Sequence, residues 1–416
     1  MNKRIILAGL AACYCCSSYA QEKATLTFAQ YMENVKNGNI SYLAEKYNVD
    51  IADAGVKAAR VFPDPELSVN YGNNQNWSLR MGYAIDASLS YTWETGGKRK
   101  ARIRLAQSEK EMTAALLEDY FRNLRADASL AWLEALKQQK LYELQKSSYE
   151  QMLELARADS VRYLLGDVME ADARQSRLEA AILLNDLYAS QGARNDALAQ
   201  LRLFQGDKQL APPDSIAGEP TSAKRAFELP ALIAAALANR ADLQAALKSQ
   251  EVSLNNLRLS KANRFVDIGL TLGAVYASEV KNEIAPAPAY KGFAAGISIP
   301  LKLSNANKAA LHAAQSATRQ DEVQYAAAEI QITAEVIRAY DKYQIACRQV
   351  EQFDAGLLRE AEAIFVKRAY SYQRGETGVS ELLNARRTCN DIRQTYIEAL
   401  YNCAAALVEI ERAACL

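Results

Sequence analysis

Apolar and polar residues alternate along four short stretches of this chain. From Leu79 to Trp93, the odd positions carry apolar and aromatic residues, whereas the even positions carry mostly small or polar ones. The same alternation covers residues 67–71, 268–276 and 293–301. A period of two is typical of a β-strand with one apolar and one polar face. The sequence therefore predicts four two-faced strands.

The apolar face of these strands is suited to lipid, because it combines aliphatic residues with Tyr and Trp near the ends. The residues expected to face lipid are Leu79, Met81, Tyr83, Ile85, Leu89, Tyr91, Trp93, Ile268, Leu270, Leu272, Tyr276, Phe293, Ile297 and Ile299. The same alternation also fits an antiparallel sheet that packs on a soluble core. Four strands cannot close a barrel and an open sheet edge is not tolerated in lipid, so membrane-spanning strands require an oligomer. Three chains would give twelve strands.

Long helical patterns occupy most of the remaining chain. Residues 98–161 contain no Pro or Gly and are rich in strong helix formers. Apolar residues recur there at spacings of three and four, which predicts a buried stripe on a helix. A turn near Gly166 leads into a return helix to about Phe204, and a second pattern, Lys308 to about Arg412, turns at Gly375 to Gly378. Long hairpins of this kind need neighbours to be stable.

The order of predicted elements occurs twice. A helix over 27–60, strands over 66–93 and a long helical segment over 98–204 are followed by the same order over 228–264, 266–301 and 308–412. The segment Tyr163-Leu-Leu-Gly166 lies 209 residues before Tyr372-Gln-Arg-Gly375. We therefore predict two repeats, 21–205 and 226–416, joined by a linker over 206–225.

Residues 1–20 are predicted to be a signal peptide, with Lys3 and Arg4 before an apolar core and a small-residue cleavage site at Ala20. Leu10-Ala11-Ala12-Cys13 also fits a lipobox, in which Cys13 would be lipidated. Both alternatives export the protein from the cytoplasm. No later stretch approaches the roughly 18 apolar residues of a membrane-spanning helix.

The composition argues against several functions. Lys+Arg and Asp+Glu are both 49, so nothing indicates a nucleic-acid partner. His312 is the single histidine, and the chain has no P-loop or His-Glu-x-x-His motif. We expect no enzyme activity, no cofactor and no metal site.

Cys347 and Cys403 each lie 28 residues from Gly375. An antiparallel hairpin could therefore place the two thiols side by side. A disulfide and a pair of buried free thiols both remain open.

Three motifs carry a family resemblance. They are Pro63-Asp-Pro65-Glu-Leu67, Trp93-Glu-Thr-Gly-Gly-Lys-Arg99, and Tyr372-x-x-Gly375 followed by Leu382-Leu383-x-Ala385. Together with the duplication, they resemble the TolC-like outer membrane efflux protein family, and more closely its CzcC-like heavy-metal branch, over about residues 25–412.

The resemblance implies a mainly α fold with membrane β-strands: duplicated long α-hairpins plus four strands per chain. It implies a homotrimer with a twelve-stranded β-barrel in outer-membrane lipid of a Gram-negative bacterium and an α-helical tunnel in the periplasm. The implied partners are a periplasmic adaptor and an inner-membrane pump of the resistance–nodulation–division (RND) type. The implied function is a passive export conduit for heavy-metal cations.

In such channels, carboxylates near the helical tips surround a closed aperture. The matching positions, six residues after each turn glycine, are Asp172 and Glu381. Gln175 and Asn384 stand where the family often has a second acid, so this acidic ring is thinner. Glu381 could instead be an ordinary solvated charge. Two further alternatives remain: a drug-efflux or type I secretion channel, and, from another class, a periplasmic coiled-coil scaffold.

Overall fold

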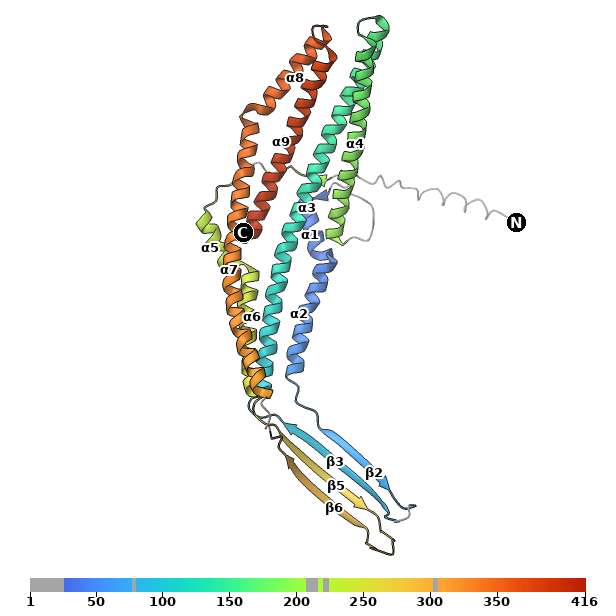
Figure 1. Ribbon diagram of the computed structural model, residues 1–416, viewed down its shortest axis with the longest axis vertical. Helices are drawn as coiled ribbons and strands as arrows, with labels where there is room; N and C mark the ends of the chain where they lie inside the picture. Colours follow the sequence, from blue (N-terminus) through green and yellow to red (C-terminus); the bar gives the residue numbers. More distant parts are fainter. Residues whose placement is uncertain (1–25, 77–79, 207–215, 220–223, 302–305) are drawn as a thin grey trace, which may run out of the picture. The chain divides into compact units, whose positions relative to one another are not determined.

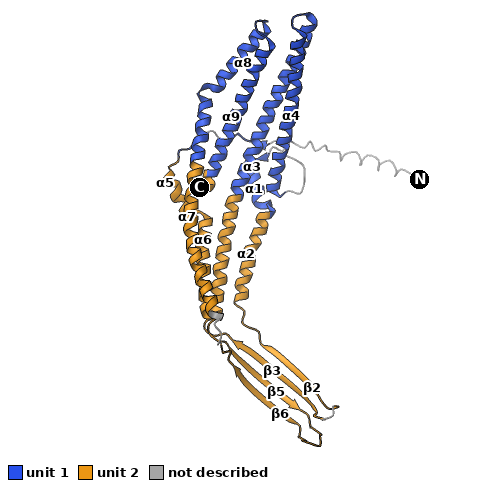
Figure 2. Ribbon diagram, viewed as in Figure 1, with its two compact units in different colours: residues 1–40, 124–226, 341–409 blue, residues 41–123, 227–340, 410–416 orange. Residues whose placement is uncertain are grey.

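The computed structural model of the protein describes residues 26–76, 80–206, 216–219, 224–301 and 306–416 (Figure 1). They form two compact units (Figure 2): unit 1 takes the described residues within 26–40, 124–226 and 341–409, and unit 2 takes those within 41–123, 227–340 and 410–416. Each unit takes segments from both predicted repeats, whose boundaries remain predictions. The predicted signal peptide, Cys13, Leu79 and most of the predicted linker lie outside the described residues.

The helix that opens each predicted repeat is broken once. α1 (Phe28–Gly38) is followed by α2 (Ile40–Ala59), and α5 (Leu229–Asn239) by α6 (Ala241–Ala262). The residues between them, Asn39 and Arg240, have extended backbone, with ψ of 114° and 126°. The prediction of one continuous helix in each place was therefore wrong, because an extended residue interrupts the ladder of helical hydrogen bonds.

The start of α1 follows from its sequence. The Thr27 side chain accepts a hydrogen bond from the Gln30 amide, and the Gln30 side chain accepts one from the Thr27 amide. This capping box satisfies amides that have no partner within the helix. Next to it, β1 (Leu26–Thr27) pairs in parallel with β4 (Ile216–Ala217).

Unit 2 contains one antiparallel four-stranded sheet in the order β2-β3-β5-β6. Its strands are β2 (Glu66–Asn73), β3 (Tyr83–Trp93), β5 (Ile268–Ala277) and β6 (Tyr290–Ser298). Each of the four predicted strands is present. The two hairpins, more than 170 residues apart in sequence, meet through β3 and β5.

Two strand ends differ from the predicted ones. β3 starts at Tyr83 instead of Leu79, because Arg80 and Gly82 have left-handed backbone, with φ of 42° and 74°. A left-handed residue cannot continue a regular strand. β6 ends at Ser298 instead of Leu301, and Pro300, which has no amide hydrogen for the ladder, follows two residues later.

The long helices are α3 (Lys98–Leu165), α4 (Glu170–Gln205), α7 (Ala306–Gln352), α8 (Leu358–Gln373) and α9 (Val379–Ala414). A π-helical segment, η1 (Phe353–Leu357), separates α7 from α8, and Gly356 within it has a φ of 133°. The prediction of an uninterrupted helix from Lys308 to the second turn was therefore wrong, because the helix is broken at Gly356. Glycine adopts this positive φ without the steric cost that a side chain would add. Among the described residues, no helix combines the length and the low polarity that a membrane crossing requires.

Candidate functional site: the sheet, the strand–helix junction and the helical turns

The register of the sheet gathers the predicted lipid-facing residues on one face. Residues directly opposite each other on antiparallel strands share a face. Leu89 pairs with Leu67 on one side and with Leu272 on the other, and Leu270 pairs with Ile297. The strand residues that this register places together are Tyr83, Ile85, Leu89, Tyr91, Trp93, Ile268, Leu270, Leu272, Tyr276, Phe293 and Ile297.

This apolar face is open to its surroundings. Phe293 is 93% exposed, Ile297 is 72% exposed and Leu272 is 65% exposed. Met81 and Ile299, which the sequence placed in the same set, lie outside the strands and are also exposed. Exposed apolar surface on this scale marks a site of interaction.

The opposite face of the sheet is small and polar. Asp86, Ser88, Thr271 and Gly273 lie on it and line a shallow depression. The sheet therefore has the two-faced character that the alternation predicts.

The motif Trp93–Arg99 forms the junction between β3 and α3. The Thr95 amide donates to Asp267 Oδ1 at 3.2 Å, and the Thr95 hydroxyl donates to the Val266 carbonyl. Lys98, which is 7% exposed, places Nζ 2.7 Å from Asp267 Oδ2. These contacts tie the β3–α3 turn to the α6–β5 turn.

Two further residues of α3 hold the end of α2. The Arg99 guanidinium donates to the Arg60 carbonyl, and that of Arg102 donates to the Ala59 and Val61 carbonyls. Arg102 also pairs with Glu94 at 2.7 Å. Cations at a helix C-terminus satisfy its last carbonyl groups. The sequence indicated the motif, but not that its side chains join three chain segments.

The two distal turns of unit 1 have the same geometry. In the first turn, the amide of Gly166 donates to the Tyr163 carbonyl, and the amide of Asp167 donates to the Arg162 carbonyl. In the second turn, 209 residues later, the amide of Gly375 donates to the Tyr372 carbonyl, and the amide of Glu376 donates to the Ser371 carbonyl. Gly166 and Gly375 have left-handed backbone, with φ of 83° and 72°. This pair of hydrogen bonds is the Schellman motif, in which glycine ends a helix. Gly378 directly precedes α9.

The two acidic residues predicted at the aperture have different surroundings. Glu381, in the first turn of α9, pairs with Arg368 of α8 at 2.5 Å, and both side chains are about half exposed. Asp172, in the first turn of α4, is half-buried. Their roles in gating remain predictions.

A buried carboxylate near the turns was missed by the sequence analysis. Asp159 of α3 is 0% exposed. It accepts hydrogen bonds from the hydroxyls of Tyr372 in α8, at 2.7 Å, and Ser176 in α4, at 2.5 Å. Asp159 thus connects three helices of unit 1. Met152, Ala156 and Asp159 follow a spacing of four and three, so a carboxylate on this apolar stripe was the available signal.

Tyr372 is buried against Val379, Leu382 and Leu383. Burial raises the pKa of Tyr372, and its hydrogen bond to Asp159 raises that pKa further. The phenol therefore remains protonated and acts as the donor to Asp159.

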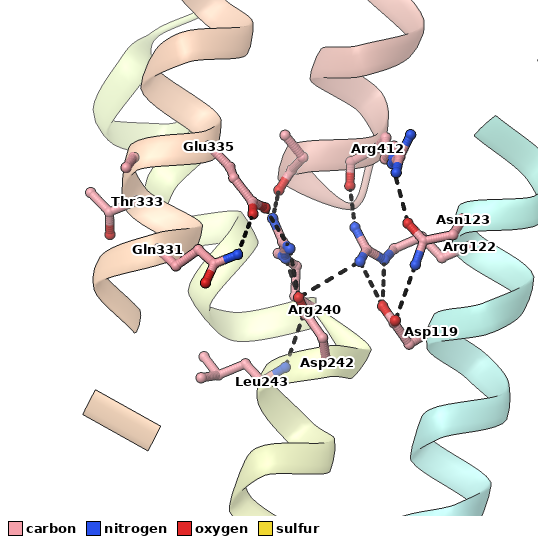
Figure 3. A network of polar contacts seen from close by, with 12 residues as sticks. Asp119, Arg122, Asn123, Arg240, Asp242, Leu243, Gln331, Thr333, Glu335 and Arg412 are labelled. Atoms are coloured by element: carbon pink, nitrogen blue, oxygen red, sulfur yellow. Dashed lines mark hydrogen bonds and ion pairs between the residues drawn. The ribbon is translucent and has the colours of Figure 1, made fainter. Parts of the chain in front are cut away.

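Unit 2 contains a second polar network that the sequence analysis missed (Figure 3). The Arg240 side chain is 5% exposed and pairs with Asp242 at 2.6 Å and with Glu335 at 2.9 Å. Arg122 Nη1 donates to the Arg412 carbonyl, and Arg240 Nη1 donates to the Ala413 carbonyl. The two arginines thus join α3, α6 and α7 to the end of α9.

The network fixes the charge of its acids. Burial opposes ionisation of Asp242, but the hydrogen bond and the charge of Arg240 outweigh it and hold the pKa of Asp242 below its usual value. The pKa of Glu335 is lowered too: burial opposes ionisation there as well, and hydrogen bonds from Gln331 and Arg240 outweigh it.

Cys347 of α7 and Cys403 of α9 lie side by side, with 3.1 Å between their sulfur atoms, and both are free thiols. Among the described residues, no group of three or more His, Cys, Asp or Glu side chains is placed to hold a metal ion.

Solved structures share this fold of a four-stranded sheet and long helical hairpins. The chain matches CusC with a TM-score of 0.75 and 17% identity, covering 93% of this chain and 91% of the other. It matches the CmeC outer membrane channel of Campylobacter jejuni with a TM-score of 0.76 and 15% identity, covering 93% and 85%. The predicted fold class is therefore confirmed.

Sequence comparisons agree with the fold. The family model described as Outer membrane efflux protein matches residues 232–415. The cobalt-zinc-cadmium resistance protein CzcC of Cupriavidus metallidurans is 24% identical over 390 residues, which cover 93% of this chain and 89% of that protein. The match over residues 232–415 agrees with the family resemblance that the motifs carry.

Proposed function

We propose that three copies of this chain form the outer-membrane exit channel of a tripartite efflux system. The observation that carries this proposal is the register of the sheet, which places eleven predicted lipid-facing residues on one exposed face. An open face of this kind is unfavourable in water and favourable against lipid hydrocarbon.

The strand order explains why several copies are needed. β2 and β6 are the outer strands of the sheet, and among the described residues each pairs with a single neighbouring strand. An outer strand leaves backbone groups unpaired, which lipid does not tolerate. Pairing β6 of one copy with β2 of the next removes these edges, and three copies give twelve strands, within the range of such barrels. The helical hairpins then continue the pore into the periplasm.

The protein acts as a passive conduit and not as an enzyme. A periplasmic adaptor and an inner-membrane pump of the RND type complete the pathway and supply the energy. The cargo is a heavy-metal cation, because the similar protein CzcC is named for resistance to cobalt, zinc and cadmium.

Neighbouring residues of β5 provide the test of membrane insertion. Leu272 lies on the apolar face and Thr271 on the polar face. Lysine on the lipid side of a barrel costs about 2–4 kcal/mol near the bilayer midplane. We therefore expect Leu272→Lys to reduce the amount of heat-modifiable trimer in the outer-membrane fraction, whereas Thr271→Lys leaves it near the wild-type level.

The opposite result separates the channel from a periplasmic scaffold. In a scaffold that stays in water, Leu272→Lys changes an exposed residue and has little effect. Equal amounts of the two variants, recovered from the soluble periplasmic fraction, would reject the channel.

A further inference from the structure

A basic cavity lies at the strand–helix junction of unit 2. It has a volume of about 280 Å³ and is lined by Lys100 and Arg104 of α3, by Arg258 and Lys261 of α6, and by Phe265. A water molecule takes up about 30 Å³, so the cavity is large enough for a phosphate group.

The positive charge of this cavity is not balanced by acids. No Asp or Glu is among the residues that line it. Arg258 donates to the neutral Asn255 side chain at 2.9 Å, and within the described ranges no carboxylate pairs with Lys100, Arg104 or Lys261.

Two other cations at the same strand–helix junction are each paired with a carboxylate. Lys98 is paired with Asp267, and Arg102 is paired with Glu94. These two residues hold the junction together, whereas the four cations of the cavity have no carboxylate partner in the part of the chain that the structure describes. Cations kept close together without acids repel one another and attract an anion. The N-terminal end of α3, at Gly96 and Gly97, adds the positive end of a helix dipole to the cavity.

The position of the cavity indicates the source of the anion. In the proposed channel, β3 and β5 cross the lipid, so the start of α3 and the end of α6 lie beside the headgroups of the periplasmic leaflet. Phe265, one wall of the cavity, is 59% exposed, and Trp93, at the end of β3, is 60% exposed. Exposed aromatic residues next to cations match an apolar chain joined to a charged headgroup better than a free ion.

We propose that this cavity binds the phosphate group of an anionic phospholipid in the inner leaflet of the outer membrane. The inference rests on the proposed function, because only a membrane-inserted sheet brings the cavity to a lipid headgroup. The bound lipid anchors each subunit at the level where strands become helices.

Two double variants test the site. Arg104→Gln/Lys261→Gln removes two cations of the cavity, and Arg319→Gln/Arg338→Gln removes two exposed cations of α7 in the same unit. The full-length proteins are purified from the outer membrane in a neutral detergent. Native mass spectrometry then measures binding of phosphatidylglycerol, phosphatidylcholine and inorganic phosphate.

We expect wild type and the α7 control to prefer phosphatidylglycerol to phosphatidylcholine. The cavity variant should bind phosphatidylglycerol about tenfold more weakly or worse, since each cation near a membrane surface contributes substantially to anionic-lipid binding. Unchanged binding in the cavity variant overturns the proposal. Displacement of the lipid by inorganic phosphate at comparable concentration shows a general anion site and overturns the lipid assignment.

The recovery of the wild-type protein separates this inference from the proposed function. A wild-type trimer that is present in the outer membrane but shows no charge preference rejects the lipid site alone. A wild-type protein that is absent from the outer membrane rejects both.

Discussion

The buried carboxylate of Asp159 depends for its stability on the two hydroxyl groups that donate hydrogen bonds to it. A buried carboxylate is costly unless its oxygen atoms are hydrogen-bonded, and Tyr372 and Ser176 supply those bonds. Tyr372→Phe removes one donor while keeping the ring. We expect a loss of about 1–3 kcal/mol in the stability of unit 1, measured as a lower midpoint of thermal unfolding.

Tyr370 provides the control for this prediction. It lies two residues away on α8, is 58% exposed, and contacts Arg374 at the surface. Tyr370→Phe should leave the midpoint nearly unchanged. Equal losses in the two variants would show that the Asp159 bond is not the cause.

Glu381 is predicted to attract cations at the periplasmic aperture, and its ion pair with Arg368 changes how this is tested. Glu381→Ala removes a negative charge and should lower the preference of the pore for cations in planar bilayers. Arg368→Ala leaves the carboxylate unpaired and should raise that preference. The same selectivity in wild type and both variants would remove Glu381 from the mechanism.

The thiols of Cys347 and Cys403 are close enough to react, but their chemistry opposes it. Burial and the neighbouring Cys347 raise the pKa of Cys403 to about 12, and the thiolate is the reactive form. We therefore expect both thiols to be free in protein isolated from the outer membrane. Alkylation after unfolding without a reductant, followed by mass spectrometry, should label both residues, and a mass lower by two hydrogen atoms would contradict this.

The Arg240 network, which joins several helices of unit 2, makes the stability of the folded protein depend on pH. The pKa values of Asp242 and Glu335 are lowered in the folded protein. Their contribution is therefore present above the unfolded values of about 4 and is lost as the pH falls through the folded values. We expect Asp242→Asn to lower the unfolding midpoint at pH 7 and to have a smaller effect in acid.

An exposed acid of the same unit serves as the comparison. Glu322 of α7 is exposed, so Glu322→Gln should change the midpoint little at either pH. A deficit of Asp242→Asn that stays constant between neutral and acidic pH would reject the network as the source of the pH dependence.

The elements that the sequence predicted correctly are those with a local signal. Strict alternation predicted β3 and β5, and the spacing around Gly166 and Gly375 predicted both turns. The breaks at Asn39 and Arg240 were missed, because neither residue is a helix breaker by type. The partners of Asp159 and Arg240 were missed for another reason: they come from distant helices, and one sequence does not show which helix faces which.

Loss of the entire protein should affect the host through the cargo that it no longer exports. We expect a deletion strain to become sensitive to zinc, cobalt or cadmium and to keep normal resistance to common antibiotics. The measurement is growth in graded concentrations of each metal, with copper, silver and several antibiotics included. Sensitivity to antibiotics alone would favour a drug-efflux channel.

The π-helical segment at Gly356 has a consequence for assembly. α3 runs without a break for 68 residues, whereas its counterpart is divided into α7, η1 and α8. Three subunits would therefore display six helical tips of two unequal kinds in alternation. A partner protein that binds all six helical tips through one type of surface would have to accommodate both kinds of tip. Copies of that partner would then occupy two distinguishable environments.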